Sequence, residues 1–171
     1  TDLYISTRKL KISIGVTSMT ESFEIFDESF KELIKDSIGV TSSATGFTFT
    51  EGPVWYNNSL LFSDIPNNRI IKYELSAEGP AISTFRYPSG NSNGMTLDLK
   101  NNLIVCEHSN RRVTSTDGNG NIQEIVSTYE GKRLNSPNDV VVKTDGWIYF
   151  TDPPYGLPNR SDGKELDFNG V

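Results

Sequence analysis

The sequence predicts an all-β protein built from repeated units. After residue 45, short runs rich in Val, Ile, Phe, Tyr and Thr alternate with clusters of Asn, Gly and Asp, which is typical of strands and turns. One pattern then recurs three times, at intervals of 42 and 45 residues. Each repeat opens on a polar residue, runs into a short strand, turns, and enters a second strand that ends in a carboxylate. Four strands in about 40 to 45 residues are typical of a propeller blade, so we predict a propeller architecture.

The three repeats also predict individual strands and turns. The turns are expected at 57–58, 101–102 and 145–146, where Asn or Asp-Gly pairs stand between apolar runs. Two further strands are expected in the first unit and two in the second, over 69–74, 82–87, 111–116 and 122–127. The repeats themselves run from Glu51 to Asp64, from Asn93 to Glu107 and from Asn138 to Asp152. Residues 46–171 are therefore predicted to form three blades.

The first 45 residues have a different character. Residues 1–21 mix Ser, Thr and Lys with a short apolar run and show no clear period, so we expect an appended or edge segment. Residues 22–45 are predicted to form a short helix and a lead-in, because Phe23, Phe26 and Phe30 recur at helical spacing and Gly39 closes the pattern. We expect these phenylalanines to pack on the main body.

Composition narrows the class of protein. With 16 basic and 22 acidic residues the net charge is −6, so the chain repels a nucleic-acid backbone on average, and no nucleic-acid partner is expected. No apolar run approaches the ~20 residues of a membrane helix, so no membrane partner is expected either. The single cysteine, Cys106, excludes an internal disulfide framework. We expect Cys106, Trp55 and Trp147 to pack within the blades. The cellular location stays open, with the cytoplasm favoured over the periplasm.

The periodic pattern also predicts where polar side chains meet. In a blade the first strand runs beside the central channel, so Glu51, Asn93 and Asn138 are expected near the axis at one end. The second strand is antiparallel to the first and returns to that end. Its last residues are therefore expected on the same rim; these are Asp64, Glu107 and Asp152.

A rim of carboxylate and amide oxygens suits a hard cation. Ca²⁺ takes several oxygen ligands in a flexible shell, whereas zinc favours His and Cys. Glu51 supplies charge, and Asn138 supplies a neutral carbonyl oxygen that protonation cannot remove. The alternative is that an Asn at a strand start only caps a turn, but three equivalent positions favour a site. We therefore predict a site for Ca²⁺ or another divalent cation.

The single histidine, His108, follows Glu107 at this rim. It is a candidate base, a candidate hydrogen-bond partner of substrate, or a turn residue, and the sequence leaves these three roles open. The chain has no G-x-S-x-G motif, and one histidine in an acidic rim does not make a Ser-His-Asp triad. Serine nucleophile chemistry is therefore not expected.

Several motifs together resemble a known family over residues 23–171. They are Glu51-Gly-Pro-Val-Trp, Val-Cys-Glu107-His108, Pro-Asn138-Asp139-Val and Thr-Asp152-Pro-Pro-Tyr155-Gly. They are similar to the gluconolactonase branch of the senescence-marker-protein, gluconolactonase and luciferin-regenerating-enzyme family. The resemblance implies a six-bladed propeller with a divalent metal, usually Ca²⁺, at the top of the channel. It also implies hydrolysis of lactones or, as in the related diisopropylfluorophosphatase, of phosphofluoridates.

The resemblance further implies roles for individual residues. Glu51 and Asn138 correspond to two metal ligands, and Asp139 lies beside the second. The family's other Asn ligand and its ligand Asp, which is also the proposed base, belong to later blades and lie beyond residue 171. In this chain the candidate catalytic residues are therefore Asp139 and Asp152. The candidate substrate contacts are Asn93, Glu107, His108 and Tyr155.

The expected function is thus a calcium-dependent sugar-lactone hydrolase that acts on a small-molecule lactone. The alternatives are a metal-dependent phosphotriesterase and a non-enzymatic propeller that binds a partner or serves as a scaffold. Three blades are half of the family's six, so three arrangements are open. The chain is a piece of a longer enzyme, it pairs with a separate chain that supplies the other blades, or two copies close head to tail as a homodimer.

Overall fold

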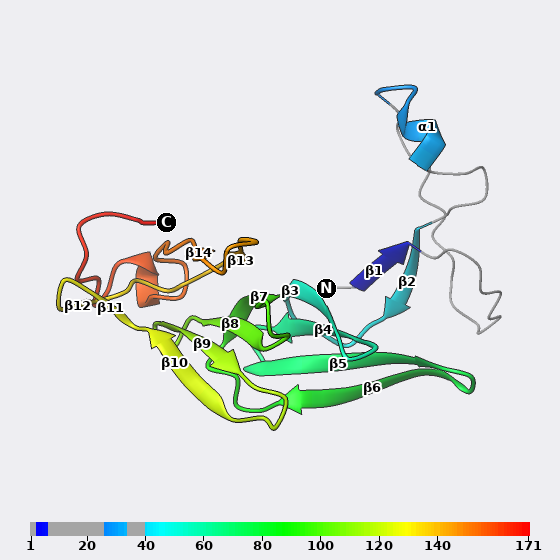
Figure 1. The fold of residues 1–171 in the computed structure, drawn as a ribbon, viewed down its shortest axis with the longest axis horizontal. Coiled ribbons are helices and arrows are strands. Elements are labelled where there is room, and N and C mark those ends of the chain that lie inside the picture. Colours follow the sequence, from blue (N-terminus) through cyan, green and yellow to red (C-terminus); the bar gives the residue numbers. More distant parts are fainter. Residues whose placement is uncertain (1–2, 7–25, 34–39) are drawn as a thin grey trace. The chain divides into compact units, whose positions relative to one another are not determined.

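The computed structural model describes residues 3–6, 26–33 and 40–171 and divides the chain into two compact units, Thr1–Phe47 and Thr48–Val171 (Figure 1). In the first unit, strand β1 (Leu3–Ser6) pairs antiparallel with strand β2 (Val40–Ala44). The sequence pattern did not predict these two strands. Helix α1 (Phe30–Leu33) is a single turn.

The described part of the predicted helix is shorter than expected. Phe26 precedes α1 and is 90% exposed. Its expected packing on the main body stays a prediction. Asp27 explains the local turn, because its carboxylate accepts hydrogen bonds from the backbone and side chain of Ser29. Phe23, Gly39 and residues 7–21 lie outside the described residues. No helix in the described ranges is long and apolar enough to cross a membrane.

The second unit contains two four-stranded antiparallel sheets in which each strand pairs with the next along the chain (Figure 1). The first sheet consists of β3 (Thr50–Tyr56), β4 (Ser59–Asp64), β5 (Arg69–Ser76) and β6 (Gly79–Arg86). The second consists of β7 (Ser92–Leu97), β8 (Leu103–Glu107), β9 (Arg112–Thr116) and β10 (Ile122–Val126). The predictions of an all-β fold and of four strands in each of the first two units are confirmed.

The turns lie where the sequence predicted them. Asn57 and Asn58 join β3 to β4 with φ values of 45° and 62°, and Asn101 has a φ of 64°. A two-residue hairpin turn of type I′ needs positive φ at both positions, and Asn tolerates this conformation better than most residues. The Asn57–Asn58 pair therefore closes the β3–β4 hairpin. The β7–β8 connection is a longer loop over 98–102, in which only Asn101 of the second pair has positive φ.

The third repeat forms only one hairpin in this chain. Strands β13 (Val140–Val142) and β14 (Ile148–Phe150) pair antiparallel, and Asp152 makes an isolated bridge with Gly170. Pro153 and Pro154 follow directly and prevent a continued ladder, because proline has no backbone N–H to donate. The two expected strands of the third repeat are present, and an irregular segment with a 3₁₀ turn over Pro158–Arg160 follows. That this repeat forms a third blade stays a prediction. A short hairpin of β11 (Thr128–Tyr129) and β12 (Lys132–Arg133) precedes β13 in the chain.

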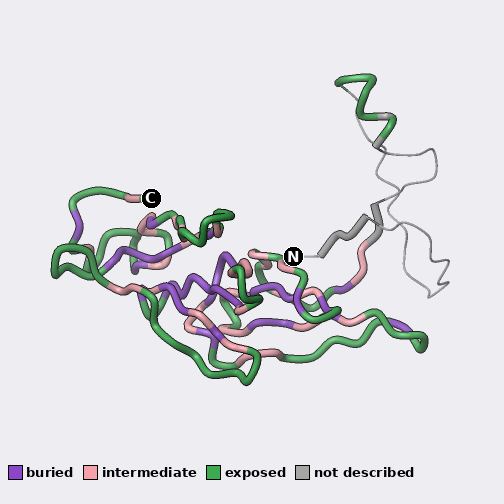
Figure 2. The backbone as a smooth tube through the Cα atoms, viewed as in Figure 1, coloured by how far each residue is buried: buried purple, intermediate pink, exposed green. Residues whose placement is uncertain are grey.

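Strand β8 is the centre of the core, and all five of its residues are buried (Figure 2). Because successive strand residues face opposite sides, β8 contributes to two apolar clusters. Leu103 and Val105 pack with Ile70 of the first sheet, whereas Ile104 and Cys106 pack with Val140 of the third hairpin. The sheets therefore stack face to face, as blades do. Each buried aliphatic side chain contributes about 1.5 to 3 kcal/mol to stability.

The two tryptophans do not pack as expected. Trp55 on β3 is 57% exposed and Trp147 beside β14 is 69% exposed, so the prediction that they pack within the blades is wrong. Val141 and Tyr149, which oppose each other on β13 and β14, are also exposed. Within residues 48–171, the outer faces of the first and third sheets thus present apolar side chains. Cys106, in contrast, is fully buried in the core, as predicted.

Candidate functional site

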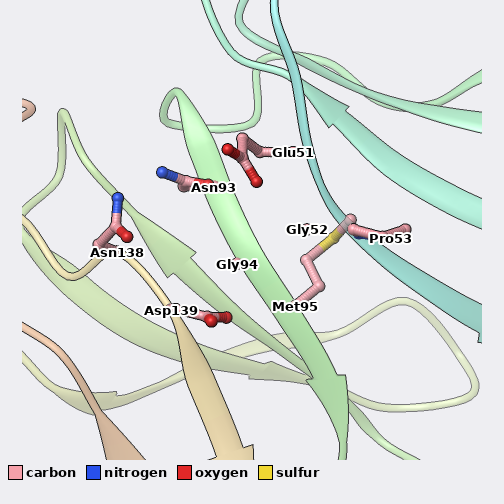
Figure 3. Close-up of a pocket in the computed structure, with 8 residues that line it drawn as sticks. All are labelled: Glu51, Gly52, Pro53, Asn93, Gly94, Met95, Asn138 and Asp139. Carbon is pink, nitrogen blue, oxygen red and sulfur yellow. The ribbon is translucent and has the colours of Figure 1, made fainter. Parts of the chain in front are cut away.

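A pocket of about 280 Å³ lies where the first strands of the three repeats come together (Figure 3). The strands are β3, β7 and the segment that leads into β13. The pocket is lined by Glu51, Gly52, Pro53, Asn93, Gly94, Met95, Asn138 and Asp139. The structure thus brings together the three residues that open the repeats, and it adds Asp139 to them.

Irregular pairing aims these side chains at the pocket. The β3–β4 register shifts between Glu51 and Val54, and the β7–β8 register shifts between Ser92 and Met95. A bulge lets a strand redirect a side chain that would otherwise follow the regular alternation of the ladder. The shifts occur at equivalent places in the two units, so Glu51 and Asn93 are presented to the pocket in the same way.

Two glycines allow neighbouring repeats to approach at this point. A Cβ atom on Gly52 would overlap the carbonyl oxygen of Asn93. A Cβ atom on Gly94 would lie 2.6 Å from the carbonyl oxygen of Asn138 and 2.7 Å from Oδ1 of Asp139. The backbone N–H of Gly94 donates a hydrogen bond of 2.7 Å to the same Asn138 oxygen. The sequence signal for this close approach is the glycine that follows the first polar residue of the repeat, Gly52 after Glu51 and Gly94 after Asn93. The repeat pattern alone did not predict the close approach.

Replacing Gly94 by Ala is expected to destabilise the protein by about 1 to 3 kcal/mol, because the added methyl group meets backbone atoms that cannot move aside independently. Urea denaturation measures this loss. The matched control is Gly118→Ala, where an added Cβ has nothing within 4 Å; it should change stability by less than about 0.5 kcal/mol. Equal stability of the two variants would contradict the close approach described for Gly94.

His108 directly follows β8 and contacts two residues that line the pocket. It is only 6% exposed, and its Nε2 atom lies 3.3 Å from Nδ2 of Asn93 and 3.4 Å from Nδ2 of Asn138. An amide nitrogen can only donate, so these two contacts are hydrogen bonds in the tautomer that carries the ring proton on Nδ1 and leaves Nε2 as the acceptor. Burial lowers the pKa of His108, which favours this neutral form.

The rim carboxylate of the first repeat does not face the pocket. Asp64 is fully buried and accepts hydrogen bonds from the Thr48 backbone (3.1 Å), Asn67 (2.8 Å) and Arg69 Nε (3.0 Å). Burial raises the pKa of Asp64, but these hydrogen bonds outweigh it and lower the pKa below its ordinary value. Asp64 lies at the same end of the sheet as Glu51, as expected, because it pairs with Thr50. Its side chain does not line the pocket and instead clamps the hairpin between β4 and β5.

Glu107, a candidate substrate contact, is held in the same way. Its Oε2 atom accepts hydrogen bonds from Asn110 (2.6 Å) and Arg112 Nε (2.8 Å), and its Oε1 atom accepts one from Thr114 (3.0 Å). Both oxygens are engaged and the residue is 2% exposed, so the structure places Glu107 in a structural clamp rather than at the pocket. The signal was present in the sequence, since a carboxylate followed by Asn at +3 and Arg at +5 occurs in both units.

Asp152, a candidate catalytic residue, also lies away from the pocket lining. It is 3% exposed, and its Oδ2 atom accepts a 2.7 Å hydrogen bond from the backbone of Asn135. Burial raises the pKa of Asp152, although hydrogen bonds from the Asn135 and Ser136 backbones and the charge of Arg111 act in the opposite direction. The contacts of Asp152 thus anchor the loop that precedes β13.

Tyr155, a candidate substrate contact, is 59% exposed and lies under the guanidinium of Arg160, whose Cζ atom is 5.5 Å from the ring centre. It does not line the pocket. The next residue, Gly156, packs against His108 so closely that a Cβ atom there would lie 2.6 Å from that of His108. Tyr155 therefore belongs to a loop that covers the histidine.

The residues of the pocket fit a hard cation by their chemistry. Glu51 and Asp139 offer carboxylate oxygens, and the side chains of Asn93 and Asn138 offer amide oxygens. Among the described residues no three His, Cys, Asp or Glu side chains form a metal-binding group, so a cation here would depend on the amide oxygens as well. This donor set suits Ca²⁺ or Mg²⁺ and does not suit a thiolate- or imidazole-bound metal.

A family model describing an SMP-30/gluconolactonase/LRE-like region matches residues 49–168. The chain belongs to this family. The match covers the whole second unit except its ends and includes every residue of the pocket. The family membership predicted from the motifs is thereby confirmed.

Similar proteins of this family carry the gluconolactonase name. The chain is 35% identical to a gluconolactonase from Zymomonas mobilis, over 85% of this chain and 45% of the relative. A solved gluconolactonase structure from Xanthomonas campestris aligns with a TM-score of 0.65 and 36% identity, over 72% of this chain and 42% of the other. A solved putative gluconolactonase aligns with a TM-score of 0.64 and 38% identity, over 73% and 44%. The chain thus spans less than half the length of these relatives.

Proposed function

We propose that the protein is a sugar-lactone hydrolase that depends on a divalent cation, with Ca²⁺ the favoured ion. The single observation that supports this most is the pocket in which Glu51, Asn93, Asn138 and Asp139 meet. It combines an oxygen donor set with space for a small ligand, in a chain similar to gluconolactonases.

Glu51 and Asn138 are the residues that would hold the cation. The Glu51 side chain is exposed at the pocket and supplies the negative charge, and the half-buried Asn138 supplies a neutral amide oxygen (Figure 3). When bound, the cation supplies Lewis-acid polarisation of the lactone carbonyl. The narrow gap that Gly52 and Gly94 permit brings both donors within one pocket.

Asp139 is the favoured proton acceptor of this chain. It is exposed and lines the pocket, and its Oδ1 atom accepts a 2.9 Å hydrogen bond from the backbone of Val140. Oδ2 then takes the proton of the attacking water. The carbonyl carbon gains the water oxygen, the ring C–O bond breaks, and the released alkoxide takes the proton from Asp139. Asp152 is a weaker candidate because it is buried outside the pocket lining.

Asn93 is the favoured substrate contact. Its amide lies between Glu51 and Asn138 at the pocket, where its oxygen would accept a hydrogen bond from a sugar hydroxyl (Figure 3). Tyr155 is a second candidate, from the loop that covers His108. A hydroxylated lactone therefore fits the polar lining better than an apolar ester does.

We further propose that the active protein is a six-bladed propeller completed by blades beyond those described. The support is the exposed apolar surface on the outer sheets, which includes Trp55, Val141 and Tyr149 and would be covered by neighbouring blades. The added blades would come from the remainder of a longer chain, from a separate chain, or from a second copy. Sedimentation of the purified protein distinguishes a homodimer from the other two arrangements.

The decisive experiment measures hydrolysis of glucono-1,5-lactone by the full-length protein in a pH-stat. We expect hydrolysis that a chelator abolishes and added Ca²⁺ restores. Faster turnover of a phosphotriester such as paraoxon would instead support the phosphotriesterase alternative. Absence of hydrolysis of either substrate, with Ca²⁺ present, would contradict the enzyme and leave the binding or scaffold function as the better explanation.

A further inference from the structure

We propose that His108 is a positioning residue: its Nε2 atom holds the amide nitrogens of Asn93 and Asn138, so that both amide oxygens are presented to the pocket. The proposal deepens the proposed function, because it rests on the cation site suggested there. It also selects among the roles that the sequence left open for His108.

The geometry of the two amides carries this inference. Nε2 of His108 lies 3.3 Å from Nδ2 of Asn93 and 3.4 Å from Nδ2 of Asn138. The oxygen and nitrogen of a carboxamide diverge from one planar carbon, so holding the nitrogen in place fixes the direction in which the oxygen points. In Figure 3 the nitrogen of Asn93 lies on the side of Asn138, and its oxygen lies on the side of Glu51. The Nε2 atom of His108 thus orients two side-chain amides, and with them the two oxygens that would bind a cation.

The histidine itself is firmly held, which a positioning residue requires. Its backbone N–H donates to the Asn91 carbonyl (3.3 Å), and its own carbonyl accepts from the Arg111 N–H (3.2 Å). Gly156 packs directly on the imidazole. A Cβ atom added to this glycine would lie only 2.7 Å from Cγ of His108. Ser136 fixes that glycine, because its Oγ atom accepts the Gly156 N–H at 2.8 Å. The ring therefore has little freedom to turn.

The backbone of Asn93 is fixed from the opposite side as well. Ser63 on β4 donates its hydroxyl hydrogen bond to the Asn93 carbonyl at 2.8 Å, and both residues are buried. Asn93 is thus held at its main chain by one sheet and at its side chain by His108. Metal-binding groups oriented by such outer contacts lose about 10- to 100-fold in metal affinity when the contact is removed.

A catalytic-base role for His108 does not fit this arrangement. Nε2 already faces two amide nitrogens, and the residue is 6% exposed. A base would need this nitrogen to face a water or a substrate hydroxyl in the pocket. His108 consequently contributes through Asn93 and Asn138 rather than by touching the reacting atoms.

The test compares three variants of the full-length protein: His108→Leu, which removes the acceptor; His108→Gln, which retains an acceptor oxygen; and Cys106→Ala, which removes buried volume two residues away. Ca²⁺ affinity is measured by calorimetry, thermal stability by calorimetric scanning, and amide orientation by the side-chain ¹⁵N–¹H signals of Asn93 and Asn138 without added cation. We expect His108→Leu to weaken Ca²⁺ binding by about tenfold or more, and His108→Gln to restore most of that loss. Cys106→Ala should lower the melting temperature without changing the affinity.

The outcomes separate this inference from the proposed function. If the wild-type protein binds no Ca²⁺, the cation site fails, and the amide signals alone then decide the role of His108. These signals should shift in His108→Leu and stay close to wild type in His108→Gln. Unshifted amide signals in His108→Leu would overturn the proposal, as would a Ca²⁺ affinity in that variant equal to the wild-type value.

Discussion

Replacing Glu51 by Gln is expected to abolish Ca²⁺ binding and lactone hydrolysis together in the full-length protein. The substitution keeps the size of the side chain and removes only its negative charge, which a hard divalent cation needs in a site otherwise rich in neutral amide oxygens. Stability should change by less than about 0.5 kcal/mol, because Glu51 is exposed. Calorimetry with Ca²⁺ and the pH-stat assay measure the two losses on the same preparation.

The control for this experiment is Glu124→Gln, which also removes one exposed carboxylate but lies on β10, outside the pocket. It should leave both Ca²⁺ affinity and turnover unchanged. Unchanged Ca²⁺ affinity in Glu51→Gln would remove Glu51 from the cation site. A variant that binds Ca²⁺ normally but loses turnover would assign Glu51 to the substrate instead.

Replacing Glu107 by Gln is expected to destabilise the protein by about 3 to 5 kcal/mol, because it leaves buried positive charge without its partner. Oε1 of Glu107 lies 3.8 Å from Nη1 of Arg86, whose side chain is 9% exposed. Burial lowers the pKa of Arg86, and the charge of Glu107 opposes that effect. Arg86 Nη1 has no hydrogen-bond partner among the described residues, so Glu107 is its principal compensation.

Urea denaturation of wild type and variant measures this difference. Glu124→Gln again serves as the control, since Glu124 pairs with Arg112 at 3.6 Å at an exposed site. Such pairs contribute about 0 to 1 kcal/mol, so the control should be close to wild type. A loss below about 1 kcal/mol in Glu107→Gln would show that the clamp is not the stabilising element we describe.

Much of the fold could be predicted from local sequence. Asn57, Asn58 and Asn101 adopt a positive-φ conformation that few other residues tolerate, so they marked the connections between these strands correctly. The runs that became β5 and β9 are rich in β-forming residues and lie between turn clusters, and both were predicted. The β1–β2 pair was not predicted, because its two strands are 33 residues apart and neither segment has a period that indicates a partner.

The candidate site was predicted less evenly. Glu51, Asn93 and Asn138 were placed together because they open equivalent repeats, and the structure brings them to one pocket. Their roles stay predictions. Asp64 and Glu107 also occupy equivalent positions, at the ends of the second strands of their repeats. Each, however, accepts a hydrogen bond from an arginine of the following strand and does not face the pocket.

The sequence alone therefore determined the repeat period and the order of strands and turns within the repeats. It also determined that the residues opening the three repeats lie at one end of the fold. Only the tertiary structure decided which polar side chains at that end face the pocket. The reason is geometric: adjacent strand residues face opposite sides, and a register shift beside Glu51 or Asn93 redirects a side chain without changing the composition that sequence patterns report. The contacts of His108 with two amides depend in the same way on strands of different repeats meeting in space.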